Sequence, residues 1–512
     1  MRVPLTVNDF LYRAGAVCAD ATAVVDEPVQ PTEPVTTTSY GQLLGRVRAW
    51  QAGLDALGVG PGERVAVVSH NAARLLELMY AVPASGRVCV PVNFRLRAEE
   101  VDYIVGHCGA SVLLVDPELD EPLKAVQAQH RFVLGGETDE HVMRFGTEPR
   151  AWGEPDEDAT ATINYTSGTT ARPKGVQITH RNLWVNAMSF GLHLRLWEGD
   201  VYLHTLPMFH ANGWGLPYPL AGLGVKQVVL RKVDGEEILR RVDEHGVTLM
   251  CGAPAVWNAV LDAAARWPGE VPGRERVRIV CAGAPPPTRM IRRVEEELGW
   301  EFIQIYGLTE TSPIVTFNRT RPSDAGLPAE ERARRLGRAG APALGVQVDV
   351  PDSGEVLVRS NVVFERYWEN PDASAEALTD GWFRTGDGGT LDEDGYLTIS
   401  DRRKDVIITG GENVSSIEVE NCIFSHPAVA EVAVIGVPDE KWGETVKALV
   451  VPAHGAEVTE REIIAHCKER LAGFKAPTSV EFREAIPRTA TGKIQKFKLR
   501  EPYWAGHERK VN

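Results

Sequence analysis

A short run of small and hydroxyl residues offers the first candidate for chemistry. It reads Thr166-Ser-Gly-Thr-Thr-Ala-Arg-Pro-Lys-Gly175 and lies between two apolar segments, 161–165 and 176–179. Such a turn exposes backbone N–H groups and hydroxyls to phosphate oxygens, and Lys174 adds a positive charge. It is not a Walker loop, because GxxxxGK[ST] is absent and a strand is expected to follow. From these residues alone, a phosphate site and an ordinary Gly-Thr turn remain equally open.

Four further motifs follow in order along the chain. They are Tyr306-Gly-Leu-Thr-Glu310, Thr385-Gly-Asp387, Asp401-Arg-Arg-Lys-Asp405 with Gly410-Gly-Glu-Asn413, and Pro487-Arg-Thr-Ala-Thr-Gly-Lys493. Together with the first run, they resemble the adenylate-forming superfamily of acyl- and aryl-CoA synthetases, peptide-synthetase adenylation domains and luciferases. Each match alone is weak, and their shared order over nearly the whole chain makes the resemblance specific.

The resemblance implies an acyl-CoA synthetase that works in two steps. A carboxylic acid attacks the α-phosphorus of ATP to give an acyl-adenylate and pyrophosphate, and the CoA thiol then displaces AMP. A carboxylate is already ionised at neutral pH, so the first step needs positive charge and oriented donors rather than a general base. The implied co-substrates are ATP and CoA, and the implied metal is Mg²⁺. A ligase that loads a carrier protein or stops at the adenylate, and a luciferase-like or non-catalytic relative, are the alternatives.

The resemblance also assigns a nucleotide site. Lys493 would bridge the acid and the α-phosphate, and Glu310 would hold Mg²⁺, an ion that needs only one or two protein carboxylates. Tyr306 would stack on adenine, and Asp387 would accept the ribose hydroxyls. Without the resemblance, a solvated lysine, a core aromatic and a turn aspartate would explain Lys493, Tyr306 and Asp387. The nucleotide set is Thr166, Ser167, Gly168, Thr169, Thr170, Lys174, Gly283, Ala284, Pro285, Tyr306, Gly307, Thr309, Asp387, Arg402 and Lys493; the catalytic set is Lys493, Glu310, Thr166 and His210.

His210 belongs to Pro207-Met-Phe-His-Ala-Asn-Gly-Trp214, which resembles the family's motif at the mouth of the acyl pocket. The expected pocket residues are His210, Trp214, Gly252, Ala253 and Trp257, with a core histidine as the alternative for His210. Segments 184–190 and 208–214 contain no aspartate that would pair with a substrate ammonium group, so an uncharged acyl tail is favoured. The motif looks most like medium- to long-chain fatty acyl-CoA synthetases, but the tryptophans equally suit an aryl or bulky polycyclic acid.

The last functional assignments concern CoA and the change between the two steps. By resemblance, Lys404 is the hinge about which a small domain rotates. Rotation would withdraw Lys493 and bring a second loop beside the pantetheine tunnel. The CoA set is Gly410, Gly411, Glu412, Phe474 and Lys475.

The elements that must position these residues can also be predicted. Apolar segments at 64–69, 88–92 and 110–115, and later at 227–230, 248–250 and 277–281, alternate with helical patterns such as 71–82. This alternation predicts an α/β fold with parallel sheets covered by helices.

A hairpin and strand at 392–400 and the charged run 401–405 mark a change near residue 400. We therefore expect a large N-terminal domain of stacked α/β sheets, 1–401, that binds ATP and the acyl group. A small, mobile α+β lid, 402–512, would carry the catalytic lysine. A surface loop within one domain is the alternative.

Composition narrows the class of protein. The formal net charge of −15 argues against general affinity for nucleic acid. Seven scattered cysteines without a CxxC pair indicate reduced thiols and a cytoplasmic location. No secretion signal is recognisable, and no apolar run approaches the roughly 18 residues of a transmembrane helix. A homodimer is possible by resemblance.

Overall fold

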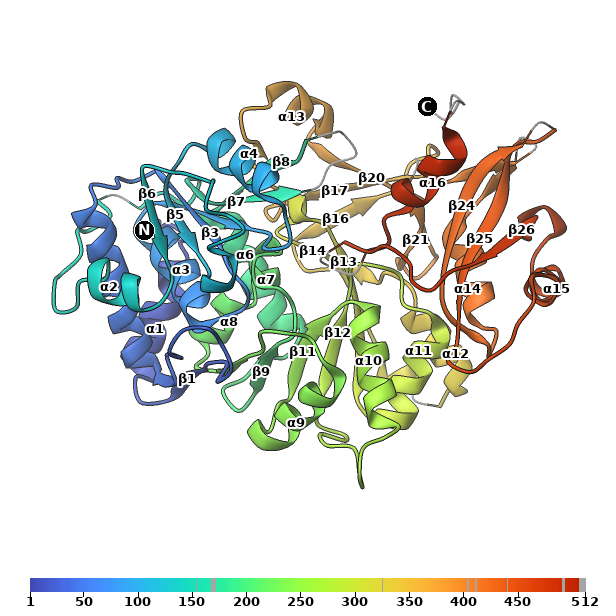
Figure 1. The fold of residues 1–512 in the computed structure, drawn as a ribbon, viewed down its shortest axis with the longest axis horizontal. Coiled ribbons are helices and arrows are strands. Elements are labelled where there is room, and N and C mark those ends of the chain that lie inside the picture. The colour runs from blue at the N-terminus through green and yellow to red at the C-terminus, as the bar shows by residue number, and fades with distance from the viewer. Residues whose placement is uncertain are drawn as a thin grey trace.

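The computed structural model describes residues 1–153, 155–166, 172–324, 326–402, 405–409, 412–439, 441–489 and 493–505, without the side chains of Asp401, Arg402 and Asn413. Within these ranges the strands form four sheets, here numbered I to IV. Sheets I to III lie together on one side of the molecule, and sheet IV follows at the C-terminal end (Figure 1).

Sheet I is built from buried valine-rich strands. Its order is β18 (Arg366–Tyr367), β8 (Lys174–Thr179), β7 (Thr160–Thr166), β4 (Val88–Val92), β3 (Arg64–Val68), β5 (Ala110–Val115) and β6 (His130–Val133). The strands from β7 to β6 are parallel, and apolar side chains on both faces suit strands covered by helices. The strands expected near 64, 88 and 110 are therefore confirmed, and the helix expected from residue 71 is α3 (Ala73–Ala84).

Sheet II repeats this plan. Its order is β15 (Ala341–Pro342), β14 (Ile314–Arg319), β13 (Glu301–Gly307), β12 (Arg278–Cys281), β11 (Leu249–Gly252), β9 (Val201–His204), β10 (Lys226–Val229), β1 (Thr22–Val25) and β2 (Thr37–Ser39). The strands from β13 to β1 are parallel, including the three predicted ones.

The predicted parallel sheets are confirmed in their centres, but antiparallel strands flank them. Strand β8 runs antiparallel to β7, and β14 runs antiparallel to β13. Only seven residues, 167–173, connect β7 to β8. A parallel crossover needs about a dozen residues or more, so the short phosphate-loop connection requires an antiparallel pair.

Helices cover the sheets on both sides (Figure 1). The N-terminal helices pack beside sheet I and the 235–298 helices beside sheet II. The helices are α1 (Asn8–Val17), α2 (Tyr40–Ala56), α3, α4 (Ala98–Cys108), α5 (Gly136–His141), α6 (His180–His193), α7 (Ala211–Trp214), α8 (Pro217–Gly222), α9 (Gly235–His245), α10 (Pro254–Ala264), α11 (Thr288–Arg293), α12 (Ala329–Leu336), α13 (Pro371–Ala377), α14 (Ser416–Phe424), α15 (Glu460–Arg470) and α16 (Lys496–Trp504). Among the described helices, none combines the length and hydropathy needed to span a bilayer.

The boundary between sheets III and IV lies in the charged run 401–405. Sheet III has the order β16 (Val346–Asp349), β17 (Glu355–Ser360), β20 (Trp382–Leu391) and β19 (Leu378–Thr379), and β21 (Leu397–Arg402) pairs with β20. Sheet IV has the order β23 (Glu412–Val414), β22 (Ile407–Thr409), β25 (Gly443–Pro452) and β24 (Val429–Asp439), and β26 (Ser479–Phe482) pairs with β25. Sheet IV, α14 and α15 enclose a separate apolar core around Ile407, Val434 and Ile463.

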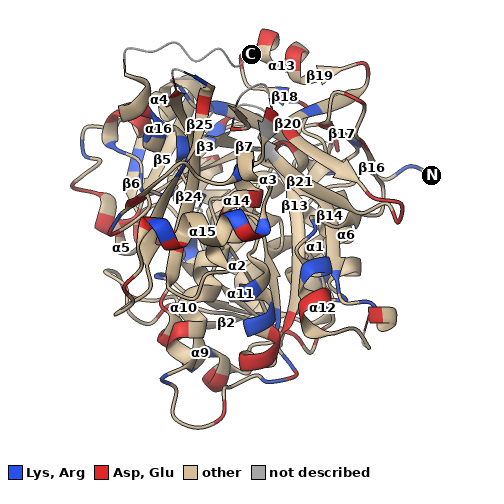
Figure 2. Cartoon of the chain, turned by 90° about the vertical axis from the view of Figure 1, so that its right-hand side faces the viewer, with Lys and Arg blue, Asp and Glu red and all other residues tan. Residues whose placement is uncertain are grey.

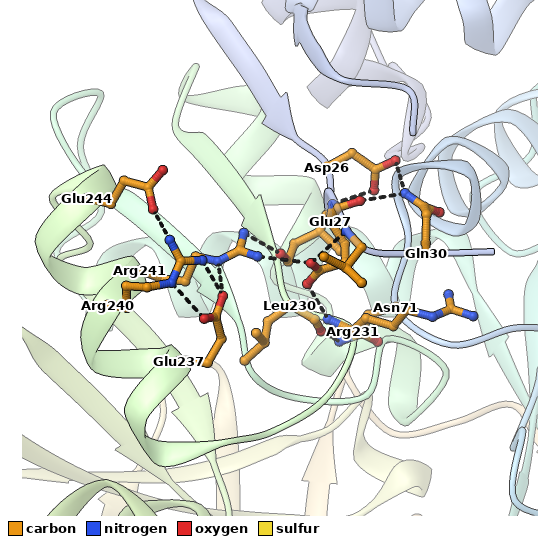
Figure 3. Close-up of polar contacts among 12 residues, drawn as sticks. Asp26, Glu27, Gln30, Asn71, Leu230, Arg231, Glu237, Arg240, Arg241 and Glu244 are labelled. Carbon is orange, nitrogen blue, oxygen red and sulfur yellow. Dashed lines mark hydrogen bonds and ion pairs between the residues drawn. The ribbon is translucent and has the colours of Figure 1, made fainter. Parts of the chain in front are cut away.

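A buried polar network joins sheets I and II (Figure 3). Glu27, just after β1, accepts the backbone N–H of Arg231 at 3.2 Å and the guanidinium of Arg241 at 3.0 Å. The guanidinium of Arg231 also forms a two-bond pair with Asp116 at 2.7 and 3.0 Å, and both side chains are almost fully buried. Buried charges are tolerated when they are paired in this way. The network therefore holds the ends of β1, β5 and β10 together.

Asn71 extends this network toward the acyl motif. Its amide donates to the carbonyls of His204, Leu206 and Leu230 at 2.9–3.1 Å and accepts the backbone N–H of Met208 at 2.8 Å. The side chain is buried, and both ends of its amide are hydrogen-bonded. Asn71 thus fixes segment 204–208, which leads into His210, against the loop after β3.

Charged residues of both signs are interspersed over the side of the molecule in Figure 2. For example, the basic helix α11 runs directly into the acidic turn Val294–Leu298. The described residues in this view therefore form no extended surface of one sign.

Candidate active site

Lys174, Tyr367 and Glu310 form one corner of the candidate site. The Lys174 ammonium lies 4.8 Å from the centre of the Tyr367 ring, and the Tyr367 hydroxyl donates to Glu310 Oε1 at 3.0 Å. Burial, aided by the Glu310 charge, raises the pKa of Tyr367, which keeps its hydroxyl a donor. Thr166, the last residue of β7, lies opposite Lys174, the first residue of β8, in the antiparallel pair. The phosphate-loop strands and the Glu310 motif, far apart in sequence, therefore meet at this corner.

The donor set at this corner fits Mg²⁺. Glu310 is half-buried, and no group of three or more His, Cys, Asp or Glu that could hold a metal occurs among the described residues. Mg²⁺ bound to a nucleotide takes most of its oxygens from phosphates and water, so one carboxylate suffices. The neighbouring Lys174 suits the phosphates that would accompany the ion.

Tyr306 and Asp387 meet at a second corner. The Tyr306 hydroxyl donates to Asp387 Oδ2 at 2.7 Å, and Asp387 is buried. Behind it, the buried Glu355 accepts the Gly386 N–H at 3.2 Å and the Arg384 guanidinium at 2.5 Å. Gly386 has φ +72°, a conformation that favours glycine. Glu355 thus fixes the turn that carries Asp387, and the Asp387 carboxylate lies beside the Tyr306 hydroxyl.

The backbone beside Tyr306 leaves space only for glycine. A Cβ on Gly307 would lie 1.6 Å from the carbonyl oxygen of Pro313. Thr309 is buried in the short helix Thr309–Thr311 that carries Glu310. Gly283, with φ +89°, begins the predicted adenine segment 283–285 directly after β12, which is the neighbour of β13. These residues lie at or shortly after the carboxyl ends of the adjacent parallel strands β12 and β13, where ligands bind in α/β proteins.

Lys493 and His210 interact across the two parts of the chain. Burial, together with the charge of Lys493, lowers the pKa of His210 to about 3, so its imidazole is neutral. The Lys493 carbonyl accepts the Thr489 N–H at 2.7 Å, and the Lys493 N–H donates to Thr489 Oγ1 at 3.0 Å. The C-terminal loop therefore places a lysine close enough to the acyl motif to act on its histidine.

The acyl motif continues as a left-handed turn. Ala211, Asn212, Gly213, Trp214 and Gly215 all have φ between 37° and 70°. Such values are strained for a residue as large as Trp214, and strain of this kind is kept where surrounding contacts enforce it. Here the Asn186 amide donates to the Trp214 carbonyl at 3.3 Å. The turn buries the Trp214 side chain directly after His210, leaving 4% exposed.

Three other predicted pocket residues lie at or behind β11. Gly252 ends this strand, and Ala253 precedes α10. Trp257 is fully buried among core residues Val260 and Leu261, and a Cβ on Gly252 would come within 3.0 Å of its ring. The structure thus places Trp257 beneath Gly252, and its contact with an acyl group stays a prediction.

The predicted CoA residues are only partly described. Phe474 is 46% exposed, Glu412 is also exposed, and the Lys475 ammonium binds both Glu418 oxygens at 2.7 and 2.8 Å. Ser167, Gly168, Thr169, Thr170, Lys404, Gly410 and Gly411 lie outside the described residues, as does the side chain of Arg402. Their assignments stay predictions.

The motifs did not identify three positioning residues, Asn71, Asn186 and Tyr367. Each acts through contacts with residues distant in sequence, as with Tyr367 and Glu310. In the sequence, each of them is only a polar or aromatic residue in or beside an apolar segment. This pattern does not indicate which residue it contacts.

Comparisons with known proteins agree with this geometry. Residues 11–368 match the AMP-binding enzyme family, and residues 418–493 match the AMP-binding enzyme C-terminal domain. The chain is 37% identical to a 2-methylpropanoate–CoA ligase of Humulus lupulus, covering 97% of this chain and 95% of the relative. It is also 37% identical to 4-hydroxybutyrate–CoA ligase 2 of Metallosphaera sedula, with coverages of 97% and 94%.

Solved structures give the same result. An anthranilate CoA ligase in complex with anthranoyl-AMP superposes with a TM-score of 0.87 at 28% identity, covering 98% of this chain and 99% of that one. A Mycobacterium tuberculosis fatty acyl CoA synthetase superposes with a TM-score of 0.73 at 32% identity, with coverages of 98% and 99%. Both matches extend over the large and the small part of the chain. The chain therefore belongs to the AMP-binding enzyme family and is an AMP-forming ligase.

Proposed function

We propose that this protein converts a carboxylic acid to its CoA thioester in two steps at one site, with the small C-terminal part supplying Lys493 for the first step. The observation that carries the proposal is the family match over both parts of the chain, together with the corner formed by Lys174, Tyr367 and Glu310. The effect of the Lys493 charge on the pKa of His210 supports a state in which the lysine loop approaches the acyl motif.

In the first step, Lys493 brings two anions together. Its ammonium would lie between the acid carboxylate and the α-phosphate of ATP, offsetting their repulsion and stabilising charge on the transferred phosphoryl oxygens. His210 remains neutral at physiological pH, so it would orient the acyl carbonyl without adding a competing charge. Lys174 and the hydroxyl of Thr166 would hold the departing phosphates.

Glu310 would hold Mg²⁺ in this step, with Tyr367 orienting its carboxylate. When bound, the ion neutralises phosphate charge and favours departure of pyrophosphate. At the other end of the nucleotide, Asp387 would accept the ribose hydroxyls, and Tyr306 would pack on adenine next to segment 283–285.

In the second step, the small part would rotate about Lys404, so that Lys493 leaves and the Gly410–Glu412 loop approaches. Phe474 and Lys475 would contact the nucleotide of CoA. Sheet III ends with β21 at Arg402 and sheet IV begins with β22 at Ile407, which supports a division of the chain close to the predicted boundary between 401 and 402. The CoA thiol would then attack the acyl carbonyl, and AMP would leave.

For the acid, we propose a short-chain, uncharged aliphatic acyl group. Trp214 is buried one turn after His210, and its backbone N–H donates to the His210 carbonyl at 3.3 Å. From this position its indole would limit the length of an acyl chain. The two relatives described above are named for four-carbon acids, which supports the same choice. Longer fatty acids and aryl acids remain the comparison substrates.

A pyrophosphate-release screen tests this proposal. Purified enzyme with ATP and Mg²⁺ would receive C3–C6 acids, C8–C16 fatty acids and benzoates, each with and without CoA. We expect the highest kcat/KM for a short aliphatic acid, and thioester only when CoA is present. A benzoate or long-chain preference would contradict the acyl assignment. Thioester formation with an acyl carrier protein but not with CoA would contradict the proposal that CoA is the acceptor.

Two further properties belong to the proposal. All seven cysteines are free thiols, which supports a reducing compartment such as the cytoplasm. A homodimer is a separate expectation that light scattering on a sizing column would test.

A further inference from the structure

Two cysteines of the C-terminal part face each other between helices α14 and α15. Cys422 lies near the end of α14, and Cys467 lies in the last turn of α15. Cys467 belongs to the apolar cluster of sheet IV, and Cys422 packs against the same cluster. Cys422 is partly exposed, whereas Cys467 is fully buried. A partly exposed cysteine therefore lies at the same helix–helix contact as a buried one.

The neighbouring backbone fixes this contact. His466, the residue before Cys467, places its Nε2 3.0 Å from the carbonyl oxygen of Cys422 and 2.8 Å from the hydroxyl of Ser425. Both acceptors belong to the end of α14. The side chain of His466 thus ties the Cys467 turn of α15 to the Cys422 turn of α14, independently of the sulfur atoms.

The chemical environment makes Cys422 the more reactive member. The neighbouring Cys467 thiol, with help from the Arg470 charge, holds the pKa of Cys422 below its usual value, whereas the Cys422 thiol and burial raise the pKa of Cys467. A partly exposed thiol with a lowered pKa is the form that oxidants attack.

The buried cysteines elsewhere have the opposite character. Burial raises the pKa to about 11 for Cys108 and to about 12 for Cys89 and Cys251, and it also raises the pKa of Cys281. Cys18 is partly exposed like Cys422. It therefore serves as a matched control for exposure alone.

We propose that Cys422 and Cys467 are a redox modification site, in which a peroxide converts the two thiols to a reversible disulfide between α14 and α15. The Cys422 thiolate attacks one peroxide oxygen, the O–O bond breaks, and the released hydroxide takes up a proton to become water. The Cys467 sulfur then attacks the sulfur of the Cys422 sulfenic acid. The S–S bond forms as the S–O bond breaks, and the second oxygen leaves as water with the Cys467 proton. Two thiols are oxidised, and one hydrogen peroxide is reduced to two waters.

This position is distinct from the residues proposed for catalysis, but the disulfide would connect elements next to Lys475, a predicted CoA residue. Glu418 on α14 binds Lys475, and α15 ends at Arg470, just before the short helix Gly473–Lys475. The bond would therefore fix the two helices that flank the predicted CoA residues Phe474 and Lys475.

The test treats the full-length reduced enzyme with equimolar hydrogen peroxide, alkylates the remaining thiols under denaturing conditions and maps disulfides by mass spectrometry. We expect a linked peptide pair containing Cys422 and Cys467 as the main product, and its loss after dithiothreitol. Cys467→Ser should leave a Cys422 sulfenic acid that dimedone captures, and Cys422→Ser should abolish both products. Cys18→Ser should leave the linked pair unchanged.

Three outcomes would overturn the proposal. They are oxidation of Cys18 before Cys422, conversion of Cys422 in the unmodified protein to sulfinic acid without a linked peptide, and no linked peptide at peroxide concentrations that oxidise the other cysteines. Each can be read from the same digest.

Discussion

Among single residues, the carboxylates of the candidate site have partners from motifs that are distant in sequence. Asp387 receives the Tyr306 hydroxyl at 2.7 Å and rests on a turn held by Glu355. Such a carboxylate is prepared to accept hydroxyl donors without reorganising. The same arrangement explains why the Asp387 motif and the Tyr306 motif act together despite their separation in sequence.

Replacing Asp387 should therefore weaken the use of ATP. A hydrogen bond to a charged group contributes about 1.5–3 kcal/mol, so Asp387→Ala should lower kcat/KM for ATP by about 10- to 100-fold. Tyr306→Phe removes one donor and keeps the ring, and its effect should be smaller. ATP–pyrophosphate exchange measures both. An unchanged KM for ATP in Asp387→Ala would contradict the ribose assignment.

Replacing Glu310 should change the requirement for Mg²⁺. Glu310→Gln removes the negative charge but retains an oxygen that can accept from Tyr367. We expect half-maximal activity at a Mg²⁺ concentration about 10-fold higher, because a charged ligand of the ion is lost. Glu296→Gln, at an exposed acid on the surface, is the control. Identical Mg²⁺ titrations for the two variants would show that Glu310 is not a metal ligand.

At the scale of elements, ion pairs on both sides hold the lysine loop. Arg488, before Lys493, pairs with Glu431 of β24 at 2.7 Å. Lys496, after it, pairs with Glu420 of α14 at 2.8 Å, and both of these side chains are less than 20% exposed. The more buried pair should matter more, because exposed pairs contribute at most about 1 kcal/mol.

Glu420→Gln should consequently slow adenylate formation by about 3- to 30-fold, because the loop that carries Lys493 loses one support. Thioester formation from supplied acyl-AMP should change less, since it does not use Lys493. Glu457→Gln, an exposed acid of the same region, is the control. Equal losses in both half-reactions would indicate general damage to the C-terminal part instead of loss of positioning.

Helices and strands were also predicted better from the sequence than the contacts between them. Buried strands such as β3 and β4 are short valine-rich runs whose composition is sufficient to identify them. The antiparallel course of β8 and β14 was missed, because strand direction depends on the length of the connection and on sheet context. The left-handed turn at 211–215 could not be predicted from the sequence either, because Trp214 adopts φ +58° only under tertiary contacts such as that of Asn186.

Site residues were predicted by resemblance more than by local chemistry. Lys493 lies in a basic tail. Only the effect of its charge on the pKa of the distant His210 distinguishes it from a solvated lysine. Likewise, no local pattern connects Tyr367 with Glu310. Such partnerships arise from folding of the whole chain and therefore require the structure.

At the scale of the whole molecule, buried histidines predict the response to acid. Burial lowers the pKa of His180 to about 3 and that of His204 to about 4, from an ordinary 6.5. Between about pH 6 and pH 4 the unfolded chain thus binds more protons than the folded one, so stability falls as the pH falls. Two such groups correspond to ~2.7 kcal/mol per pH unit.

Thermal midpoints measured from pH 7 to pH 4.5 should accordingly fall more steeply for the unmodified protein than for His204→Gln, which cannot titrate. The slope is the readout, because the substitution also disturbs the hydrogen bond to Gln227. Parallel curves would contradict a neutral His204 in the folded protein.

In the proposed mechanism, one lysine from the C-terminal part serves the first half-reaction only. Measuring both half-reactions of Lys493→Ala tests it most directly, by ATP–pyrophosphate exchange with acid and by thioester formation from supplied acyl-AMP and CoA. Loss of an oriented charge at the reacting oxygens should reduce exchange by about 100-fold or more, while thioester formation stays within about 3-fold of the unmodified enzyme. Equal losses in the two assays would contradict the account.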